Sequence, residues 1–254
     1  RSGEGQDNTD AIRTAIEACA AMGGGAVIIP KGDWHTGPVH LKSNVNLHFE
    51  EGANLRFAED ASLYLPAVRV SIYGFECYNF SPMIYAYCCT NIAITGKGRI
   101  YGPGHGEEDA KPRHRSWCRW RESQHRLGIA NGVPIRESAI GKFTWKAGLH
   151  ILQDAAFRTT VIRERDVSGT YRLDPSLIQP VSCRDVLIED IMVAQGGPMW
   201  TIHPTLCTNV IIRNIAIHTI GTAGDAIDIY SCENVLVERC DVVAGDDIVS
   251  LKSG

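Results

Sequence analysis

Cys183-Arg184-Asp185-Val186-Leu187-Ile188 recurs twice downstream, as Cys207-Thr208-Asn209-Val210-Ile211-Ile212 and as Cys232-Glu233-Asn234-Val235-Leu236-Val237, at intervals of 24 and 25 residues. A fourth copy, Cys89-Thr90-Asn91-Ile92-Ala93-Ile94, stands upstream. A repeat of 20 to 50 residues is typical of a solenoid. Each copy holds a short β-branched run after an Asn or Asp and has no helix pair, which favours a parallel β-helix over helical repeats.

Stacked coils place equivalent residues about 4.8 Å apart, the spacing of neighbouring strands. The cysteines are therefore expected to form an inward ladder, and the Asn and Asp residues a hydrogen-bonded ladder at the turns. The chain has nine cysteines, and none has zinc-ligand spacing. We interpret them as buried thiols that act as small hydrophobic residues.

The remaining segments are predicted to build a single domain around these coils. Residues 1–25 predict an N-terminal cap: Asn8 or Thr9 starts a helix whose apolar face covers the open end of the sheets. Short apolar and alternating runs in 26–104 predict the first coils. Residues 105–171 are expected to be an irregular insertion, without an assignment for 132–171. The later coils resume at 172–254.

The composition excludes several classes of function. With 25 basic and 29 acidic residues, the chain has no electrostatic footprint for nucleic acid. The sequence contains no run of 18 apolar residues, so it predicts no membrane-spanning helix. The chain starts at Arg1 without a signal peptide, so we expect a mature product or a fragment.

Counting back from each repeated cysteine reveals two columns on successive coils. Four residues before it stand Gln179, His203 and Asp228. A polar column is expected to line a cleft, because buried polar groups need partners. Seven residues before it stand Ser176, Trp200 and Asp225. An aromatic ring one coil from a carboxylate suits sugar binding, although plain packing of Trp200 is the alternative.

The next coil brings Asp246 and Asp247. Aligning Ile227 with Ile248 sets Asp225 level with Asp246, so three carboxylates are expected within a few ångströms. Neighbours in a regular strand point to opposite faces, so Gly245 is expected to permit a bend. Crowded carboxylates raise at least one pKa, and a protonated one donates to a glycosidic oxygen while ionised ones activate water. The alternative is a turn that binds Ca²⁺ or caps a coil.

These motifs resemble glycoside hydrolase family 28, the polygalacturonases, with most similarity to bacterial exo-acting members. The resemblance rests on Asp225-Ala226-Ile227-Asp228, on 245–254 (GDDIVSLKSG) and on 200–204 (WTIHP), with further matches at 8–12, 76–82 and 91–96. It implies a right-handed parallel β-helix that hydrolyses α-1,4 galacturonan in pectin with inversion. It also implies no metal or cofactor. We expect a secreted or periplasmic monomer.

Residue by residue, the resemblance implies that Asp246 is the general acid and that Asp225 and Asp247 are the bases that position water. Asp228 and His203 would line sugar subsites. Gln179 and Trp200 are expected to bind substrate because of their places in the two columns described above.

Two departures from the family pattern stand out. Ala223-Gly224 replaces the family's Asn-Thr before the first Asp, and the chain ends before the Gly-His-Gly and Arg-x-Lys motifs. Lys252 is the nearby cation expected to substitute for the missing motifs as a substrate-binding group. We therefore expect the chain as given to be weakly active or inactive.

Two other functions remain open from the sequence alone. A Ca²⁺-dependent pectate lyase would need an arginine base, and no arginine stands beside the acidic cluster. A glycan-binding or structural β-helix without catalysis would bind oligogalacturonides without turnover.

Overall fold

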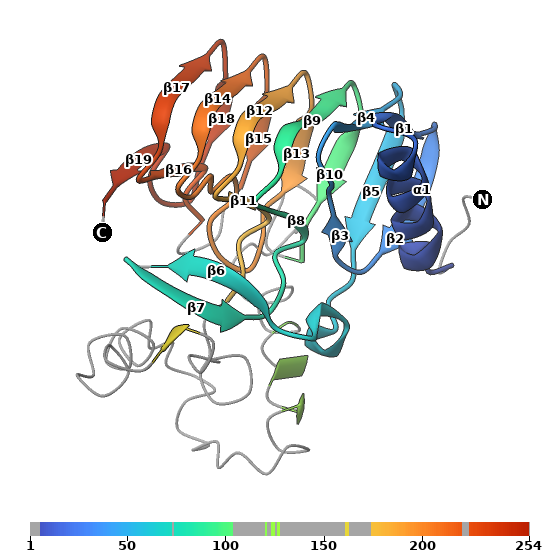
Figure 1. The fold of residues 1–254 in the computed structure, drawn as a ribbon, viewed down its shortest axis with the longest axis horizontal. Helices are drawn as coiled ribbons and strands as arrows, with labels where there is room; N and C mark the ends of the chain where they lie inside the picture. Colours follow the sequence, from blue (N-terminus) through green and yellow to red (C-terminus); the bar gives the residue numbers. More distant parts are fainter. Residues whose placement is uncertain are drawn as a thin grey trace.

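Parallel strands stacked coil upon coil form most of the computed structural model (Figure 1). The structure describes residues 6–72, 74–103, 120, 123–124, 126–127, 161–162, 174–219 and 224–253. The insertion predicted at 105–171 therefore lies almost wholly outside the described residues. The coils before and after it pair directly, because β9 (Thr90–Gly96) bonds to β12 (Arg184–Glu189).

Three faces make up each coil. The first is a six-stranded sheet in the order β1 (Gly25–Ile29), β4 (Val45–Phe49), β9, β12, β14 (Thr208–Arg213), β17 (Glu233–Glu238). The second has the order β18 (Asp241–Val243), β15 (Ala216–His218), β13 (Met192–Gln195), β10 (Arg99–Tyr101), β5 (Ala53–Phe57), β2 (Gly32–Thr36). All the pairings in these sheets are parallel, as predicted for a β-helix.

The third face holds the polar columns. It pairs β3 (Val39–His40), β8 (Ile84–Tyr87) and β11 (Ile178–Val181), and separately β16 (Ile227–Tyr230) with β19 (Val249–Lys252). Parallel bridges from Ile202 to Ile178 and to Ile227 join the two parts. The face therefore runs without interruption from the first coils to the last.

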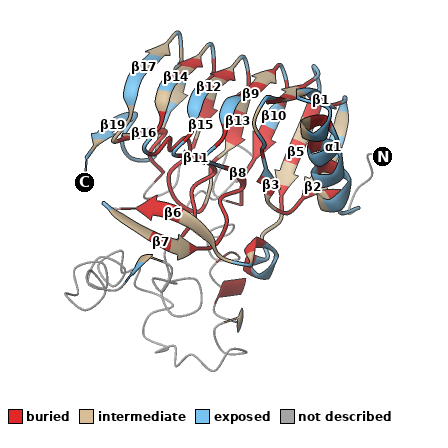
Figure 2. Cartoon of the chain, in the orientation of Figure 1, coloured by how far each residue is buried: buried red, intermediate tan, exposed pale blue. Residues whose placement is uncertain are grey.

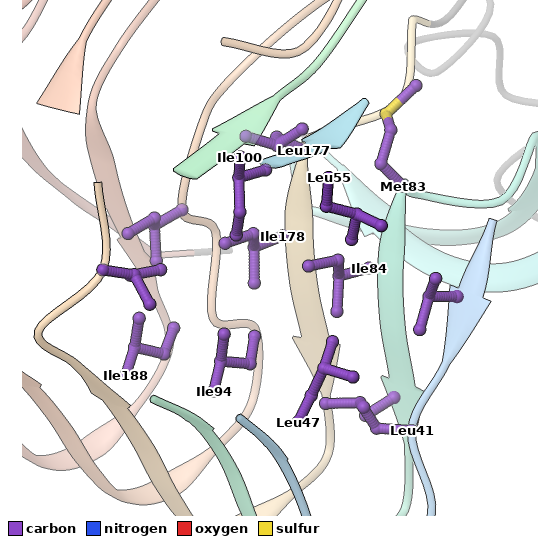
Figure 3. Packing of buried hydrophobic residues seen from close by; sticks show 14 of the residues in the cluster. Leu41, Leu47, Leu55, Met83, Ile84, Ile94, Ile100, Leu177, Ile178 and Ile188 are labelled. Carbon is purple, nitrogen blue, oxygen red and sulfur yellow. The ribbon is translucent and has the colours of Figure 1, made fainter. Parts of the chain in front are cut away.

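Inward-facing aliphatic side chains stack into a continuous core (Figure 3). Figure 2 colours the buried residues of the stacked strands red. Leu47 pairs with Ile94, Ile94 with Ile188, and Ile188 with Ile212, and all four are buried. Alternation along each strand sends every second residue inward, so the repeated β-branched positions of the sequence become columns. Burial of such columns supplies the main driving force for folding.

The turn ladder predicted from the repeats is present. Asn91, Asp185, Asn209 and Asn234 have φ between 55° and 58°. Asn and Asp tolerate this left-handed region better than most residues. The Asn209 amide donates to Asp185 at 2.7 Å, and the Asn234 amide donates to Asn209 at 3.2 Å.

The predicted cysteine ladder is also present. Cys89, Cys183 and Cys207 are buried, and the backbone N–H of Cys89 donates to the sulfur of Cys183. All the described cysteines are free thiols, and Cys118 lies outside the described residues.

Helix α1 (Thr9–Ala21) covers the N-terminal end, as predicted. Its buried face consists of Ile12, Ile16 and Cys19. Asn8 is the first flanking residue, but its side chain caps nothing, and the Asp7 carboxylate accepts from the Thr9 backbone instead. No helix in the described part of the chain is long and apolar enough to cross a membrane.

A hairpin that the sequence did not predict stands outside the coils. β6 (Val68–Ile72) pairs antiparallel with β7 (Phe75–Asn79), after a short 3₁₀ helix at Ala61–Tyr64. Figure 1 shows it apart from the stacked sheets, near the side that carries β8, β11 and β16. Val70, Ile72 and Cys77 of the hairpin pack in a second apolar cluster with Val181 and Trp200.

Candidate active site

The predicted Gln179, His203, Asp228 column exists, but its members are buried. The bridges Ile178 to Ile202 and Ile202 to Ile227 set these three residues in register on successive coils. Their exposed fractions are 3%, 0% and 0%. The expectation that the column lines an open cleft is therefore wrong for the described conformation. The covering side chains explain the difference.

Gln179 is covered by the hairpin. Its side-chain amide donates to the carbonyl oxygen of Ser71 at 3.0 Å and to the hydroxyl of Thr205 at 3.2 Å. One coil earlier, the Tyr85 hydroxyl donates to the carbonyl oxygen of Arg69 at 2.5 Å. The hairpin thus lies across the outer side of the third face at these two coils.

His203 is held neutral inside the molecule. Burial, with a smaller contribution from the positive charge of Lys252, lowers the pKa of His203 to about 3. Its Nδ1 lies 3.0 Å from the Ser176 hydroxyl, and its ring stands edge-on to Trp200 with centroids 4.7 Å apart. Its Nε2 is buried and has no hydrogen-bond partner within the described part of the chain. A neutral ring with one open nitrogen can donate to or accept from a ligand.

Trp200 packs inside and is only 3% exposed. One face of its ring meets the ammonium nitrogen of Lys252, which lies 3.6 Å from the ring centroid. The apolar cluster that includes Val70 and Met199 surrounds it as well. The packing alternative therefore describes Trp200 in this conformation, and its ring is not an open platform for a sugar.

Asp225, Asp228 and Lys252 form a charged triplet. The Lys252 ammonium donates to Oδ2 of Asp225 at 2.9 Å and to Oδ1 of Asp228. Burial raises the pKa of Asp228 to about 7, an effect that Lys252 opposes and Asp225 reinforces. The second oxygen of Asp228 has no partner among the described residues.

Asp246 and Asp247 lie in a bend before β19 and are exposed. The bend agrees with the expectation for Gly245. Neither carboxylate forms a side-chain hydrogen bond or ion pair with another described residue. The backbone N–H of Ala226 donates to the carbonyl oxygen of Asp247 at 2.9 Å, which brings the Asp225 and Asp247 segments side by side.

The alignment of the last coil was wrong by one residue. Ile227 pairs with Val249 rather than with Ile248, so Asp247, not Asp246, stands level with Asp225. Val249 and Leu251 match the alternation of Ile227 and Ile229, and a one-residue slip would turn every side chain to the opposite face. The three carboxylates remain on neighbouring segments, with Asp225 buried and the other two exposed.

Two residues that contact the polar column were not predicted from the sequence. Ser71 belongs to the hairpin, and it binds Gln179 through its backbone, which no side-chain motif reveals. Tyr230 lies edge-on to His203, with ring centroids 5.9 Å apart. Tyr230 stands two residues before Cys232, as Thr205 and Val181 stand two residues before Cys207 and Cys183. Counting back two residues from each repeated cysteine would therefore have placed Tyr230 beside this column.

Within the part of the chain that the structure describes, no group of three or more His, Cys, Asp or Glu side chains is arranged to hold a metal ion. The chemistry that the described side chains offer is proton transfer between carboxyl groups and a ligand.

The chain is similar in sequence to known glycoside hydrolases. Residues 165–254 match the model of glycosyl hydrolases family 28. The chain is 24% identical to a probable polygalacturonase of Vitis vinifera, over 99% of this chain and 42% of the relative. It is 26% identical to an exo-poly-alpha-D-galacturonosidase of Dickeya chrysanthemi, over 97% of this chain and 39% of the relative.

Among solved structures, the hyperthermoactive exopolygalacturonase of Thermotoga maritima matches with a TM-score of 0.82 and 36% identity, over 100% of this chain and 52% of that one. The predicted fold class, a right-handed parallel β-helix, is confirmed. The chain thus spans about two fifths to one half of the length of these relatives.

Proposed function

We propose that this chain, which belongs to glycosyl hydrolases family 28, carries the catalytic carboxylates of a hydrolase that cleaves α-1,4 galacturonosyl linkages in pectin-type polysaccharides with inversion. The observation that carries the proposal is the juxtaposition of Asp225 and Asp247, with Asp246 exposed beside them. Polygalacturonase names among the relatives support the substrate class.

The proposed reaction needs one acid and one base. Asp246, in its protonated form, donates its proton to the glycosidic oxygen as the bond to the anomeric carbon breaks. Asp225 and Asp247 position a water molecule on the opposite side and take its proton as it attacks that carbon. The products are a new reducing end with inverted configuration and a free hydroxyl on the departing sugar.

The hairpin favours exo action. A polysaccharide that runs along the third face from the carboxylates meets the hairpin at Gln179 and Tyr85, where β6 bonds to both side chains. The hairpin is then expected to limit how far the polysaccharide extends beyond the carboxylates in this direction. Product analysis by mass after incubation with polygalacturonate tests this mode, because exo action yields monomer and a ladder of oligomers would contradict it.

The catalytic role is tested with Asp246→Asn. The amide keeps the size of the side chain but cannot donate a proton as an acid, so we expect loss of at least about 10²-fold in reducing-sugar release. Asp241→Asn is the matched control, because Asp241 is an exposed carboxylate in β18 on a different face. Both variants should keep the far-ultraviolet circular dichroism of the parent. Activity that survives Asp246→Asn refutes the assignment.

A non-catalytic glycan-binding role is the second candidate. Asp246 and Asp247 favour it, because both are exposed, have no side-chain partner among the described residues and are open to hydrogen bonds with sugar hydroxyls. Binding of oligogalacturonides measured by calorimetry, together with no product by mass, would select this role over hydrolysis.

The setting of the protein is also proposed. A polymer as large as pectin is degraded outside the cytoplasm, so we propose a secreted or periplasmic location and a monomer. Cell fractionation of the native host and size-exclusion chromatography with light scattering test these two statements.

A further inference from the structure

Lys252 lies against side chains from two earlier coils, and 24% of its own side chain is exposed. Its ammonium nitrogen bonds to the carboxylates of Asp225 and Asp228 and lies 3.6 Å from the ring centroid of Trp200. We propose that Lys252 is a positioning residue, which fixes the orientation of Asp225 and Asp228 through its ammonium group and does not itself bind the substrate. This inference rests on the hydrolytic function proposed above.

The donor capacity of Lys252 supports this role. An ammonium group has three N–H donors and no acceptor. Two of them point at carboxylates, and the remaining side of the nitrogen faces the ring of Trp200, a favourable cation–π contact. A uronate carboxylate could bind Lys252 only by displacing one of these partners.

Displacement would leave a buried charge without compensation. Asp228 is fully buried and Asp225 is 5% exposed. Breaking a buried ion pair by removing one partner is strongly destabilising, because the other charge stays in a medium that solvates it poorly. The substrate-binding role expected for Lys252 from the sequence therefore competes with the stability of the site itself.

The register explains why one lysine reaches both carboxylates. Lys252 pairs with Tyr230 and Ser250 with Asp228, so all four side chains leave the sheets on the outer side. Lys252 reaches back along this side toward Asp228. Asp225 precedes β16 on the same coil as Asp228, so a single cation lies between them. Because Asp225 also stands level with Asp247, this cation fixes one member of the proposed catalytic set.

The groups that face Asp228 determine its titration. They are Asp225 on the same coil, Lys252 on the next coil, and His203 one coil earlier, which burial keeps uncharged. Without Lys252, two carboxylates would face each other without a cation. The pKa of Asp228 would then rise further above about 7, because Lys252 is the group that lowers it.

The test compares Lys252→Met with Lys97→Met, which removes an exposed lysine from a turn after β9. Carbon-13 NMR of aspartate carboxyl groups follows the titration of Asp228 without substrate, with Asp228→Asn for assignment. We expect the midpoint to rise by about one pH unit or more in Lys252→Met and to stay in place in Lys97→Met. An unchanged midpoint in Lys252→Met overturns the proposal.

Kinetics on polygalacturonate separate positioning from binding. A misplaced catalytic group lowers kcat by about 10²-fold, so Lys252→Met should lower kcat to this extent and leave KM within about twofold. Lys252→Arg keeps the charge and should restore the midpoint and part of kcat. A KM that rises tenfold or more with unchanged kcat would instead identify Lys252 as a substrate-binding group and overturn the proposal.

Two controls keep these outcomes decisive. If Lys252→Met does not fold, the Asp228→Asn/Lys252→Met variant lacks the buried charge and should fold. Failure of both variants would show that Lys252 acts through packing and would overturn the proposal. If the parent protein releases no sugar, the proposed hydrolysis fails, while the NMR titration without substrate still decides whether Lys252 controls Asp228.

Discussion

Asp228 and His203 lie one coil apart, and their titrations should act on stability in opposite directions. Folding raises the pKa of Asp228 from 3.8 to about 7. A carboxyl with a raised pKa binds its proton more tightly in the folded state. Its contribution to the free energy of unfolding is therefore fully present below pH 3.8 and is lost as the pH rises through 7. The perturbation that exposes this effect is Asp228→Asn, which cannot ionise.

His203 has the opposite sign. Folding lowers its pKa from 6.5 to about 3, so the folded state binds the proton more weakly than the unfolded state. Its contribution is present above pH 6.5 and is lost as the pH falls toward 3. At 1.36 kcal/mol per pKa unit, each of the two effects changes the free energy of unfolding by about 4 to 5 kcal/mol over its full pH range. Between about pH 4 and 6.5 the two slopes nearly cancel.

The assay is urea denaturation followed by circular dichroism, at half-unit steps from pH 4 to 8. Relative to the parent, the free energy of unfolding of Asp228→Asn should rise with pH by up to about 1.4 kcal/mol per unit, because only the His203 slope remains. Relative to the parent, the free energy of unfolding of His203→Asn should fall with pH by a similar amount, because only the pH dependence from Asp228 remains. Asp241→Asn, at an exposed position, should stay parallel to the parent. Slopes of the same sign in the first two variants would refute the opposing titrations.

Three further predictions concern the β-helix. Asn209→Ala should lose about 1 to 2 kcal/mol more stability than Asn209→Gly, since φ of 58° strains alanine but not glycine, and equal losses by urea denaturation would contradict this. Ile188→Ala should cost about 2 to 5 kcal/mol in the same assay, because the side chain is fully buried, and the half-buried Leu187→Ala should cost clearly less. Gly96→Ala should abolish cooperative unfolding, because φ is +105° and the new Cβ would stand 2.0 Å from the carbonyl oxygen of Phe49, and a normal transition would contradict it.

The cysteine and asparagine ladders were predictable because each repeat has the same residue types at the same positions. A cysteine that points inward, an Asn or Asp in a left-handed turn and an alternating β-branched run recur at nearly constant spacing. Stacking then turns sequence spacing into spatial neighbours, which is why Gln179, His203 and Asp228 were found together. Local propensity and pattern agree at every coil of this kind.

The hairpin and the last register were not predictable in this way. Residues 68–79 have strand-like composition, but their antiparallel pairing lies outside the repeat, and their contact with Gln179 runs through a backbone carbonyl. The last coil was aligned on a single isoleucine and not on the repeated cysteine. In the structure Ile227 pairs with Val249 and Ile229 with Leu251, a register that the sequence alone did not distinguish from a pairing of Ile227 with Ile248.

Burial of the polar column follows from these two unpredicted features. The hairpin covers Gln179, and the true register brings Lys252 onto the side of β19 that faces Asp228. With the register shifted by one residue, Lys252 would point inward, and Asp228 would have no cation to offset its burial. The observed pairing is thus favoured by the positive charge that it brings to the carboxylates of Asp225 and Asp228.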